Sequence, residues 1–164
     1  IRGGENGFLA SGLAVCDAIK VFRDYVVSDA AMNQPPIEGS YEELLGRAEK
    51  GWQFMVNSSR DPAQTEFVWQ WYAMHMPDIT FNAIRLLGNK LTGTQIDTKE
   101  NSCHASGALY HFDDCAEAVS SFAGIHTQPV LIGNNKWNEG HDVPGSTRHI
   151  DSWGSAPAVL DDVI

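Results

Sequence analysis

The stretch of sequence that decides the predicted fold is Gln128-Pro129-Val130-Leu131-Ile132, and turn-forming residues follow it directly at 133–135. A short apolar run with branched side chains that ends at glycine and asparagine is typical of a buried β-strand. A second strand is predicted over 148–153, where polar and apolar residues alternate. We therefore expect a short β-sheet in the carboxyl-terminal part of the chain.

Outside these strands, the second half of the chain predicts one longer helix and one short one. Asp113 and Asp114 suit the positive end of a helix over 113–124, and Ser155 with Pro157 starts a final short helix. Residues 88–107 carry glycine, threonine, asparagine and serine with little periodicity. They predict a long connection with one short strand near 95–96.

The first ninety residues predict four helices. Apolar residues recur at steps of three and four over 9–26, which places them on one helical face. Ser40 and Glu43 form a capping box for a helix over 40–55. Asp61, followed by proline, caps a third helix over 62–76, whose body is apolar around nearly its whole circumference, as in a central, enclosed helix. Asp78 caps a fourth helix that ends at 88.

Together these elements predict one domain over 1–164 of the α+β class, in which helices dominate. About four amino-terminal helices precede a loop-rich half with one or two helices and a short β-sheet. The length of the chain fits a single domain with an ordinary core.

Charge and hydropathy narrow the possible partners. The formal net charge is -10 and the isoelectric point is near 4.8. Nucleic acids and anionic membranes need clustered lysine and arginine, so neither is an expected partner. The apolar runs are too short for a membrane span. The start at Ile1 and the sequon at Asn57 favour a secreted or processed protein.

Side chains that bind metals gather between 103 and 115. His104 and His111 lie two helical turns apart, so both would face one side if this stretch were helical, and Asp113 and Asp114 follow closely. Imidazole and carboxylate groups bind divalent first-row metals, so these four residues are the predicted ligands. In the alternative reading, Cys103 and Cys115 form a disulfide or lie buried as thiols, and the aspartates only cap a helix.

A second group of residues, His141, His149 and Asp151, is the predicted catalytic set. On a strand, His149 and Asp151 would point to the same face, and either Asp142 or Asp151 could orient the imidazole as a general base. The nucleophile would be a cysteine or a water bound to the metal. The alternative is a surface histidine near acidic residues in a polar loop.

We therefore expect a divalent-metal-binding enzyme of hydrolytic type that uses histidine and aspartate residues of 104–151, with zinc, iron or manganese as its metal. Its substrate would be a small molecule or a peptide. The alternative is a non-catalytic subunit of a larger assembly, such as an oligomer, with the apolar helix over 62–76 buried against a protein partner. Nucleotide-binding and dithiol motifs are absent from the sequence.

Overall fold

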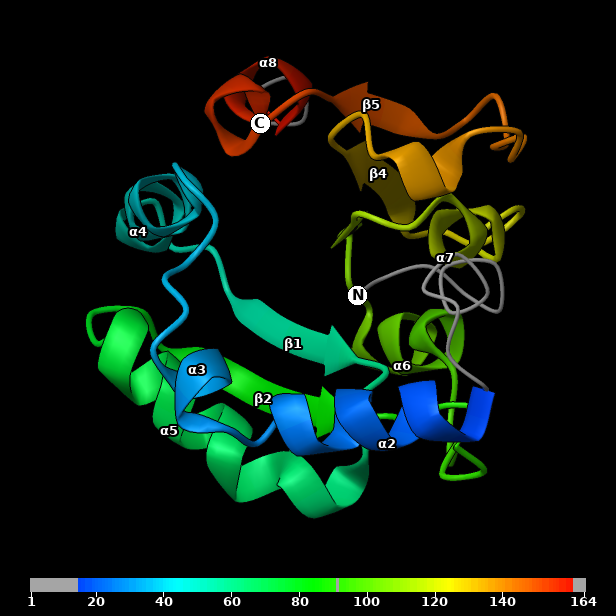
Figure 1. The fold of residues 1–164 in the computed structure, drawn as a ribbon. Coiled ribbons are helices and arrows are strands. Elements are labelled where there is room, and N and C mark those ends of the chain that lie inside the picture. Colours follow the sequence, from blue (N-terminus) through cyan, green and yellow to red (C-terminus); the bar gives the residue numbers. More distant parts are fainter. Residues whose placement is uncertain (1–14, 91, 161–164) are drawn as a thin grey trace.

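The computed structural model describes residues 15–90 and 92–160 and has a mixed α/β fold with two small parallel sheets (Figure 1). The strands are β1 (Phe54–Ser58), β2 (Phe81–Leu86), β3 (Tyr110–Asp113), β4 (Gln128–Ile132) and β5 (Arg148–Ile150). The helices are α2 (Val15–Tyr25), α3 (Asp29–Met32), α4 (Ser40–Glu49), α5 (Thr65–His75), α6 (Lys99–Ser106), α7 (Ala116–Ser120) and α8 (Pro157–Leu160). Short 3-10 helices lie at η1 (Pro62–Gln64), η2 (Lys136–Asn138) and η3 (Trp153–Ser155). The predicted helix-dominated α+β class is therefore wrong.

Every strand pairing in the described residues is parallel. β1 pairs with β2, and the second sheet has the order β3-β4-β5. Parallel neighbours need a crossover connection. α5 provides it between β1 and β2, α7 between β3 and β4, and η2 lies between β4 and β5. In Figure 1 the β1-β2 sheet lies in the lower half of the molecule and β4 and β5 lie in the upper half.

Of the four predicted amino-terminal helices, the one over 40–55 is partly wrong and the one over 78–88 is wholly wrong. Helix α4 ends at Glu49, and the following residues form β1 rather than a continuation to 55. Its N-cap is Gly39, and the hydroxyl of Ser40 is buried without a partner, so the capping box does not form. The predicted helix over 78–88 contains β2 instead. β2 carries no regular alternation of polar and apolar residues, so periodicity alone does not distinguish it from a short helix.

The connection predicted over 88–107 is also wrong, because it contains helix α6. The side chain of Thr98 accepts a hydrogen bond from the Asn101 amide at the start of this helix, and Gly107 ends it in the left-handed conformation. The predicted helix over 113–124 is shorter than expected. Residue 113 ends β3, and α7 covers only Ala116–Ser120. The site residues therefore lie on a strand and the turn after it.

Other predictions are confirmed. β4 and α8 form where expected, and β5 covers the first part of 148–153. Asp61 accepts a hydrogen bond from the Ala63 amide as the N-cap of η1, which leads into α5. α2 lies within the helix predicted over 9–26, whose residues 9–14 are outside the described residues.

The core lies on both faces of the three-stranded sheet. On one face, Val130 and Ile150 pack with Ala156 and Leu160 from the carboxyl-terminal segment. On the other, Leu131 packs against Ala116 and Val119 of α7. Helix α5 is not a central helix, because its side chains at 66, 69, 70, 73 and 74 are exposed. No helix in the described residues has the length and apolar character needed to cross a membrane.

Gly88 joins β2 to the segment that leads to α6, and we expect its substitution to destabilise the fold. Its φ is +76°, and a Cβ there would lie 1.9 Å from the Thr94 carbonyl oxygen. Gly88→Ala should lower the free energy of unfolding by more than about 2 kcal/mol, because backbone strain adds to the clash. Urea unfolding followed by circular dichroism measures this change.

Gly46 in α4 provides the matched control, since no atom beyond its chain neighbours and the nearby helix backbone lies within 4 Å of its added Cβ. Gly46→Ala should raise stability by roughly 0.5–1 kcal/mol through helix propensity. Equal effects of the two substitutions would contradict the close approach at Gly88.

Candidate functional site

The candidate site lies where the direction of the chain across the fold reverses. From β1 the chain moves outward to β2, α6 then brings it back to β3, and from there it moves outward the other way to β4 and β5. Helix α6 contacts the carboxyl ends of β1 and β3, at Asn57 and at Asp113. In open α/β sheets, ligands bind at carboxyl ends of strands beside such a switch.

A continuous series of hydrogen bonds connects these strand ends, and we call it the polar relay. Arg85 donates a hydrogen bond of 3.1 Å to the Ser102 hydroxyl, and that hydroxyl donates one of 2.7 Å to the Asn57 side-chain oxygen. The Asn57 amide nitrogen lies 3.2 Å from Cys103 Sγ, which lies 3.7 Å from His111 Nδ1. At the far end, His111 Nε2 lies 3.2 Å from Asp113 Oδ2. The members of the relay are Arg85, Ser102, Asn57, Cys103, His111, Asp113 and Lys99.

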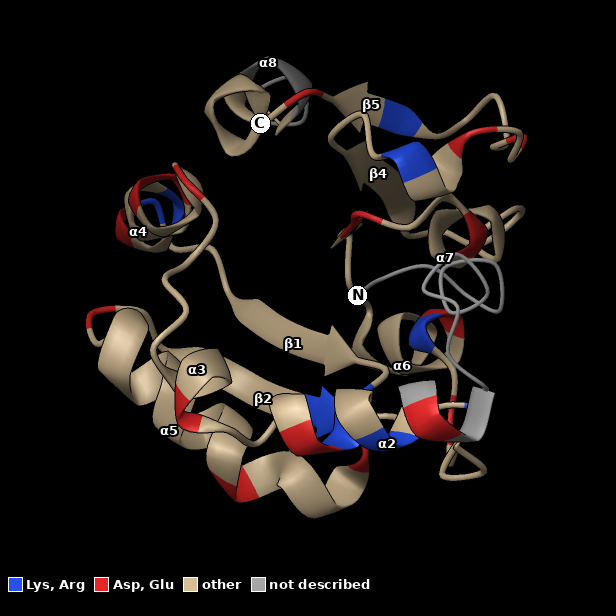
Figure 2. Cartoon of the chain, in the orientation of Figure 1, with Lys and Arg blue, Asp and Glu red and all other residues tan. Residues whose placement is uncertain are grey.

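Asp113 is the charged centre of the polar relay. Its Oδ2 accepts hydrogen bonds from Lys99 and His111, and its Oδ1 accepts one from the Cys115 amide. Burial alone would raise the pKa of this carboxyl, but the hydrogen bond from His111 and the charge of Lys99 outweigh it and lower the pKa to about 2. Asp113 is therefore a buried carboxylate at neutral pH. Figure 2 shows the basic band on α6 and the uncharged strand β1.

Cys103, His111 and Asp113 follow one another in the order of a nucleophilic triad, but the thiol is poorly suited to attack. Its side chain is 1% exposed, and burial raises its pKa to about 11 despite the hydrogen bond from Asn57. Both ring nitrogens of His111 have partners, since Nε2 lies against Asp113 and Nδ1 against the Cys103 thiol. Phe122 stacks on this ring at 4.6 Å. Cys103 therefore acts as a structural hydrogen-bonding group.

Asp114 is held in place through its backbone. Its carbonyl oxygen accepts hydrogen bonds from the side chains of Trp137 and Asn138, each with a length of 3.0 Å. It accepts a third from Asn135, with a length of 3.4 Å. Asn138 also accepts a hydrogen bond from the Ala116 amide at the start of α7. The segment after β4 thus fixes the turn that carries Asp113 and Asp114.

The structure brings only part of the predicted metal site together. His111 and Asp113 are in contact and buried, with Asp114 next in the chain. His104 is exposed on α6, whereas His111 lies on β3, so the expected pairing of the two histidines across helical turns does not arise. No group of three or more histidine, cysteine or acidic side chains arranged to bind a metal occurs among the described residues.

The predicted catalytic residues lie away from the polar relay. His149 is exposed on β5, which β4 separates from β3, and its Nε2 lies 3.2 Å from the Gly133 carbonyl oxygen. Asp151 follows β5 and accepts a hydrogen bond from Asn134, while His141 is exposed in the loop after η2. His149 and Asp151 do not lie on one strand, because β5 ends at Ile150.

The structure also bears on two other sequence features, the pair of Cys103 and Cys115 and the sequon at Asn57. Cys103 and Cys115 are both free thiols, so the alternative of a disulfide between them is wrong. Asn57 lies in β1 rather than in a surface loop, and both atoms of its side-chain amide are hydrogen-bonded within the polar relay. A folded chain would not present this amide to a glycosylating enzyme, so the sequon gives no support to a secreted protein.

Sequence reasoning missed Lys99, Ser102 and Arg85. A local sequence signal could have predicted the helix that carries Lys99. Thr98 is a good N-cap and Gly107 a good C-cap for the helix between them. That helix would have placed a lysine directly before the cysteine and histidine cluster. The contact of Arg85 with Ser102 joins residues of two separate elements, and no spacing in the sequence indicates it.

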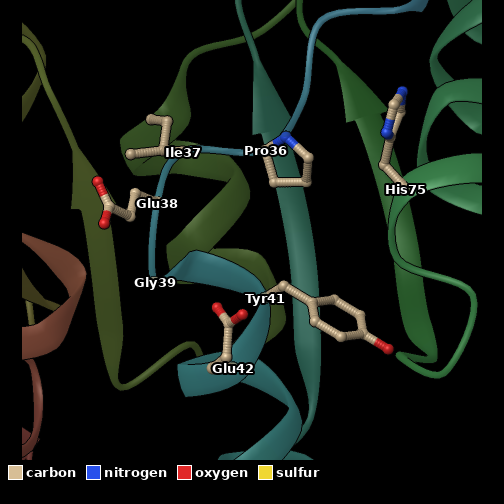
Figure 3. Close-up of a pocket in the computed structure, with 7 residues that line it drawn as sticks. All are labelled: Pro36, Ile37, Glu38, Gly39, Tyr41, Glu42 and His75. Atoms are coloured by element: carbon tan, nitrogen blue, oxygen red, sulfur yellow. The ribbon is translucent and has the colours of Figure 1, made fainter.

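A surface hollow of about 290 Å³ lies elsewhere, at the amino end of α4 (Figure 3). Two carboxylates, a tyrosine and a histidine line it together with apolar groups. The Tyr41 hydroxyl donates to Asp78, and His75 Nε2 lies 2.7 Å from the Met32 carbonyl oxygen. Since its tyrosine and histidine are hydrogen-bonded within the chain and its two carboxylates belong to exposed residues, this hollow is a weaker candidate than the polar relay. Its lining residues are Pro36, Ile37, Glu38, Gly39, Tyr41, Glu42 and His75.

Comparisons with protein-family models, curated proteins and solved structures find no match to this chain. We therefore infer function from the geometry at the carboxyl ends of β1 and β3.

The pair of Lys99 and Asp113 should make stability depend on pH. A carboxyl with a lowered pKa in the fold stabilises it above the ordinary pKa near 4, and this contribution disappears as the pH falls toward about 2. Lys99→Met removes the ammonium group but keeps an unbranched apolar side chain of similar length. We expect a loss of about 2 kcal/mol at pH 7 that shrinks steadily below pH 4, measured by urea unfolding at several pH values.

Lys20→Met is the matched control, because Lys20 pairs with Asp24 on the exposed side of α2. It should change stability little at any pH. A loss in Lys99→Met that stays constant from pH 7 to pH 2.5 would show that the charge of Asp113 is not its cause.

Proposed function

We propose that the chain is a divalent-metal-binding enzyme of hydrolytic type, with its site at the carboxyl ends of β1 and β3. The observation that carries the proposal is the position of Asp113. This buried carboxylate is ionised at neutral pH, is followed by Asp114, and lies at the point where the chain reverses direction across the fold. Carboxylates held charged in such a place are typical of sites that bind metals or substrates.

The chemistry of the available ligands favours a hard cation. A carboxylate offers about four lone-pair positions, and three hydrogen bonds to Asp113 use most of them. Asp113 would therefore supply one ligand and Asp114 a second. A pair of carboxylates suits Mg²⁺ or Mn²⁺, which keep several water ligands. Of zinc, iron and manganese, manganese fits this oxygen set best.

Asp113 and Asp114 would hold the divalent metal, which would supply the activation of water for hydrolysis. Lys99 holds the carboxylate of Asp113 in its charged form, and His111 contacts the same carboxylate oxygen and helps to orient it. We assign no role to His104, His141, His149 or Asp151, since each lies outside the polar relay. The substrate is proposed only as a small molecule or peptide that reaches the ends of β1 and β3.

Titration with Mn²⁺ followed by electron paramagnetic resonance tests the metal site. Asp114→Asn should weaken Mn²⁺ binding at least tenfold, because it removes one of two anionic ligands. Hydrolysis of p-nitrophenyl esters of acetate and phosphate with Mn²⁺ gives a second readout, and it should fall in the same variant. Circular dichroism checks that the fold is retained.

Asp151→Asn is the matched control, since this aspartate is exposed after β5. It should leave Mn²⁺ binding unchanged. The proposal fails if the unsubstituted protein binds no Mn²⁺ at millimolar concentration, or if Asp114→Asn binds it as tightly as before.

A second candidate function, a non-catalytic subunit of a larger assembly, is favoured by the outer face of α5. Residues 66, 69, 70, 73 and 74 form one exposed helical face. Trp69 is 45% exposed and Met74 is 56% exposed on this face. Large apolar side chains gathered in this way often mark a protein interface.

Light scattering over a range of concentrations tests this second function. If α5 forms a contact between copies, Trp69→Gln combined with Met74→Gln should shift the mass toward that of the monomer. Val143→Gln, another exposed apolar position, is the control. A monomer at every concentration, before and after substitution, would argue against a contact between copies.

A further inference from the structure

The side chain of Asn138, at the end of η2, binds the backbone of the turn after β3 at two places. Its nitrogen donates a hydrogen bond of 3.0 Å to the Asp114 carbonyl oxygen, and its oxygen accepts one of 2.8 Å from the Ala116 amide. These two backbone groups lie on either side of Cys115. One side chain therefore spans the turn, from the residue with the second carboxylate to the first residue of α7.

The bond to Ala116 replaces a helix cap. Cys115 is the N-cap of α7, but its side chain makes no capping hydrogen bond. The first amides of a helix have no partner within the helix, and a side-chain oxygen commonly accepts from one of them. Because Ala116 is 1% exposed, its amide needs a partner from the protein. Asn138 supplies this partner from 22 positions further along the chain.

The peptide group that joins Asp114 to Cys115 is held at both ends. Its carbonyl oxygen accepts from Asn138, and its N–H donates a hydrogen bond of 3.1 Å to Asp113 Oδ1. A peptide group is planar, so its two ends rotate together. Rotation of this group would therefore break the contact with Asn138 and the contact with Asp113 at once.

This peptide group also sets the direction of the Asp114 side chain. On the amino side of Asp114 the chain is fixed by β3, whose last residue, Asp113, pairs with Leu131 of β4. On the carboxyl side it is fixed by the peptide group that Asn138 binds. A residue has only two soft backbone dihedral angles. With the groups on both sides fixed, the bond from Cα to Cβ of Asp114 has one direction relative to the Asp113 carboxylate.

We propose that Asn138 is a positioning residue for the two carboxylates of the proposed metal site. Through one peptide group it directs the Asp114 side chain and holds the Cys115 amide against Asp113. The inference rests on the proposed function, in which both aspartates bind the metal. Partners that orient metal ligands affect the affinity of a site without touching the metal.

Two neighbours of Asn138 donate to the same carbonyl oxygen. Trp137 donates a hydrogen bond of 3.0 Å. Asn135 lies at 3.4 Å, and its amide also donates to the Ile132 carbonyl. The Asp114 carbonyl therefore keeps a close donor when Asn138 is replaced, so we expect a substitution at 138 to leave the fold intact.

A substitution that changes the charge distinguishes positioning from electrostatic attraction. Asn138→Asp keeps the shape of the side chain and an acceptor for the Ala116 amide, but it removes the donor to the Asp114 carbonyl at neutral pH. It also adds a negative charge near the turn that carries both carboxylates. By Coulomb attraction alone, this charge should strengthen the binding of a divalent cation. The positioning role predicts weaker binding.

Titration of the whole chain with Mn²⁺, followed by electron paramagnetic resonance, tests the proposal. Asn138→Asp should weaken Mn²⁺ binding at least tenfold, while circular dichroism shows that the fold is retained. Asn82→Asp is the matched control, because it makes the same change at an exposed residue of β2 whose amide donates to Gln53. It should leave Mn²⁺ binding unchanged.

Hydrogen exchange of backbone amides, measured by NMR without metal, gives a second readout. In Asn138→Asp the Cys115 amide should exchange at least tenfold faster, whereas the Ala116 amide keeps an acceptor and should exchange at its former rate. A general loss of stability would speed both amides. If Asn138→Asp does not fold, Trp137→Phe removes the other close donor to the same carbonyl and should shift Mn²⁺ binding and Cys115 exchange in the same directions.

The outcomes separate this inference from the proposed function. If the unsubstituted chain binds Mn²⁺ and Asp114→Asn weakens the binding, but Asn138→Asp does not, the positioning role alone is wrong. Equal acceleration of the Cys115 and Ala116 amides also overturns it. If the unsubstituted chain binds no Mn²⁺ at millimolar concentration, the proposed function fails, and the positioning role fails with it.

Discussion

The contact of the Lys99 ammonium with the Asp113 carboxylate is the interaction on which the rest of the site depends. Removing a carboxylate from water costs several kcal/mol unless a cation and hydrogen-bond donors replace the solvent. Lys99, His111 and the Cys115 amide are these replacements. Because the cation belongs to α6 and the carboxylate to β3, the pair fixes the helix over the strand. The same helix then holds Asn57 of β1 in place.

The fold could be predicted where burial is one-sided or a turn is well marked. β4 was recognisable because Gly133 ends its apolar run, and η1 and α5 because Asp61 and Pro62 mark their start. β1 and β2 were not, since neither strand shows a regular alternation of polar and apolar residues. Met55 fitted the helix predicted over 40–55 equally well, and only its pairing with Ala83 in the sheet decides between the two.

The site was predictable in its local part only. His111 and Asp113 are two residues apart on one strand, so their contact follows from the period of a strand once the strand is known. Lys99 lay in a segment that looked like a loop, and Asn57 lies 46 positions from Cys103. Such contacts depend on the order of the strands. The clustering of histidines in the sequence was misleading for His104, which α6 directs toward solvent.

The three side chains that converge on the Asp114 carbonyl have a consequence for motion. Two lone pairs on one oxygen serve three donors from 135–138, and Asn138 is also bonded to the first amide of α7. The loop after β4 therefore cannot lift away without freeing the turn after β3 and the start of α7. We therefore expect these segments to open together as one cooperative unit, so that a substitution in the loop changes how often the turn with the carboxylates opens.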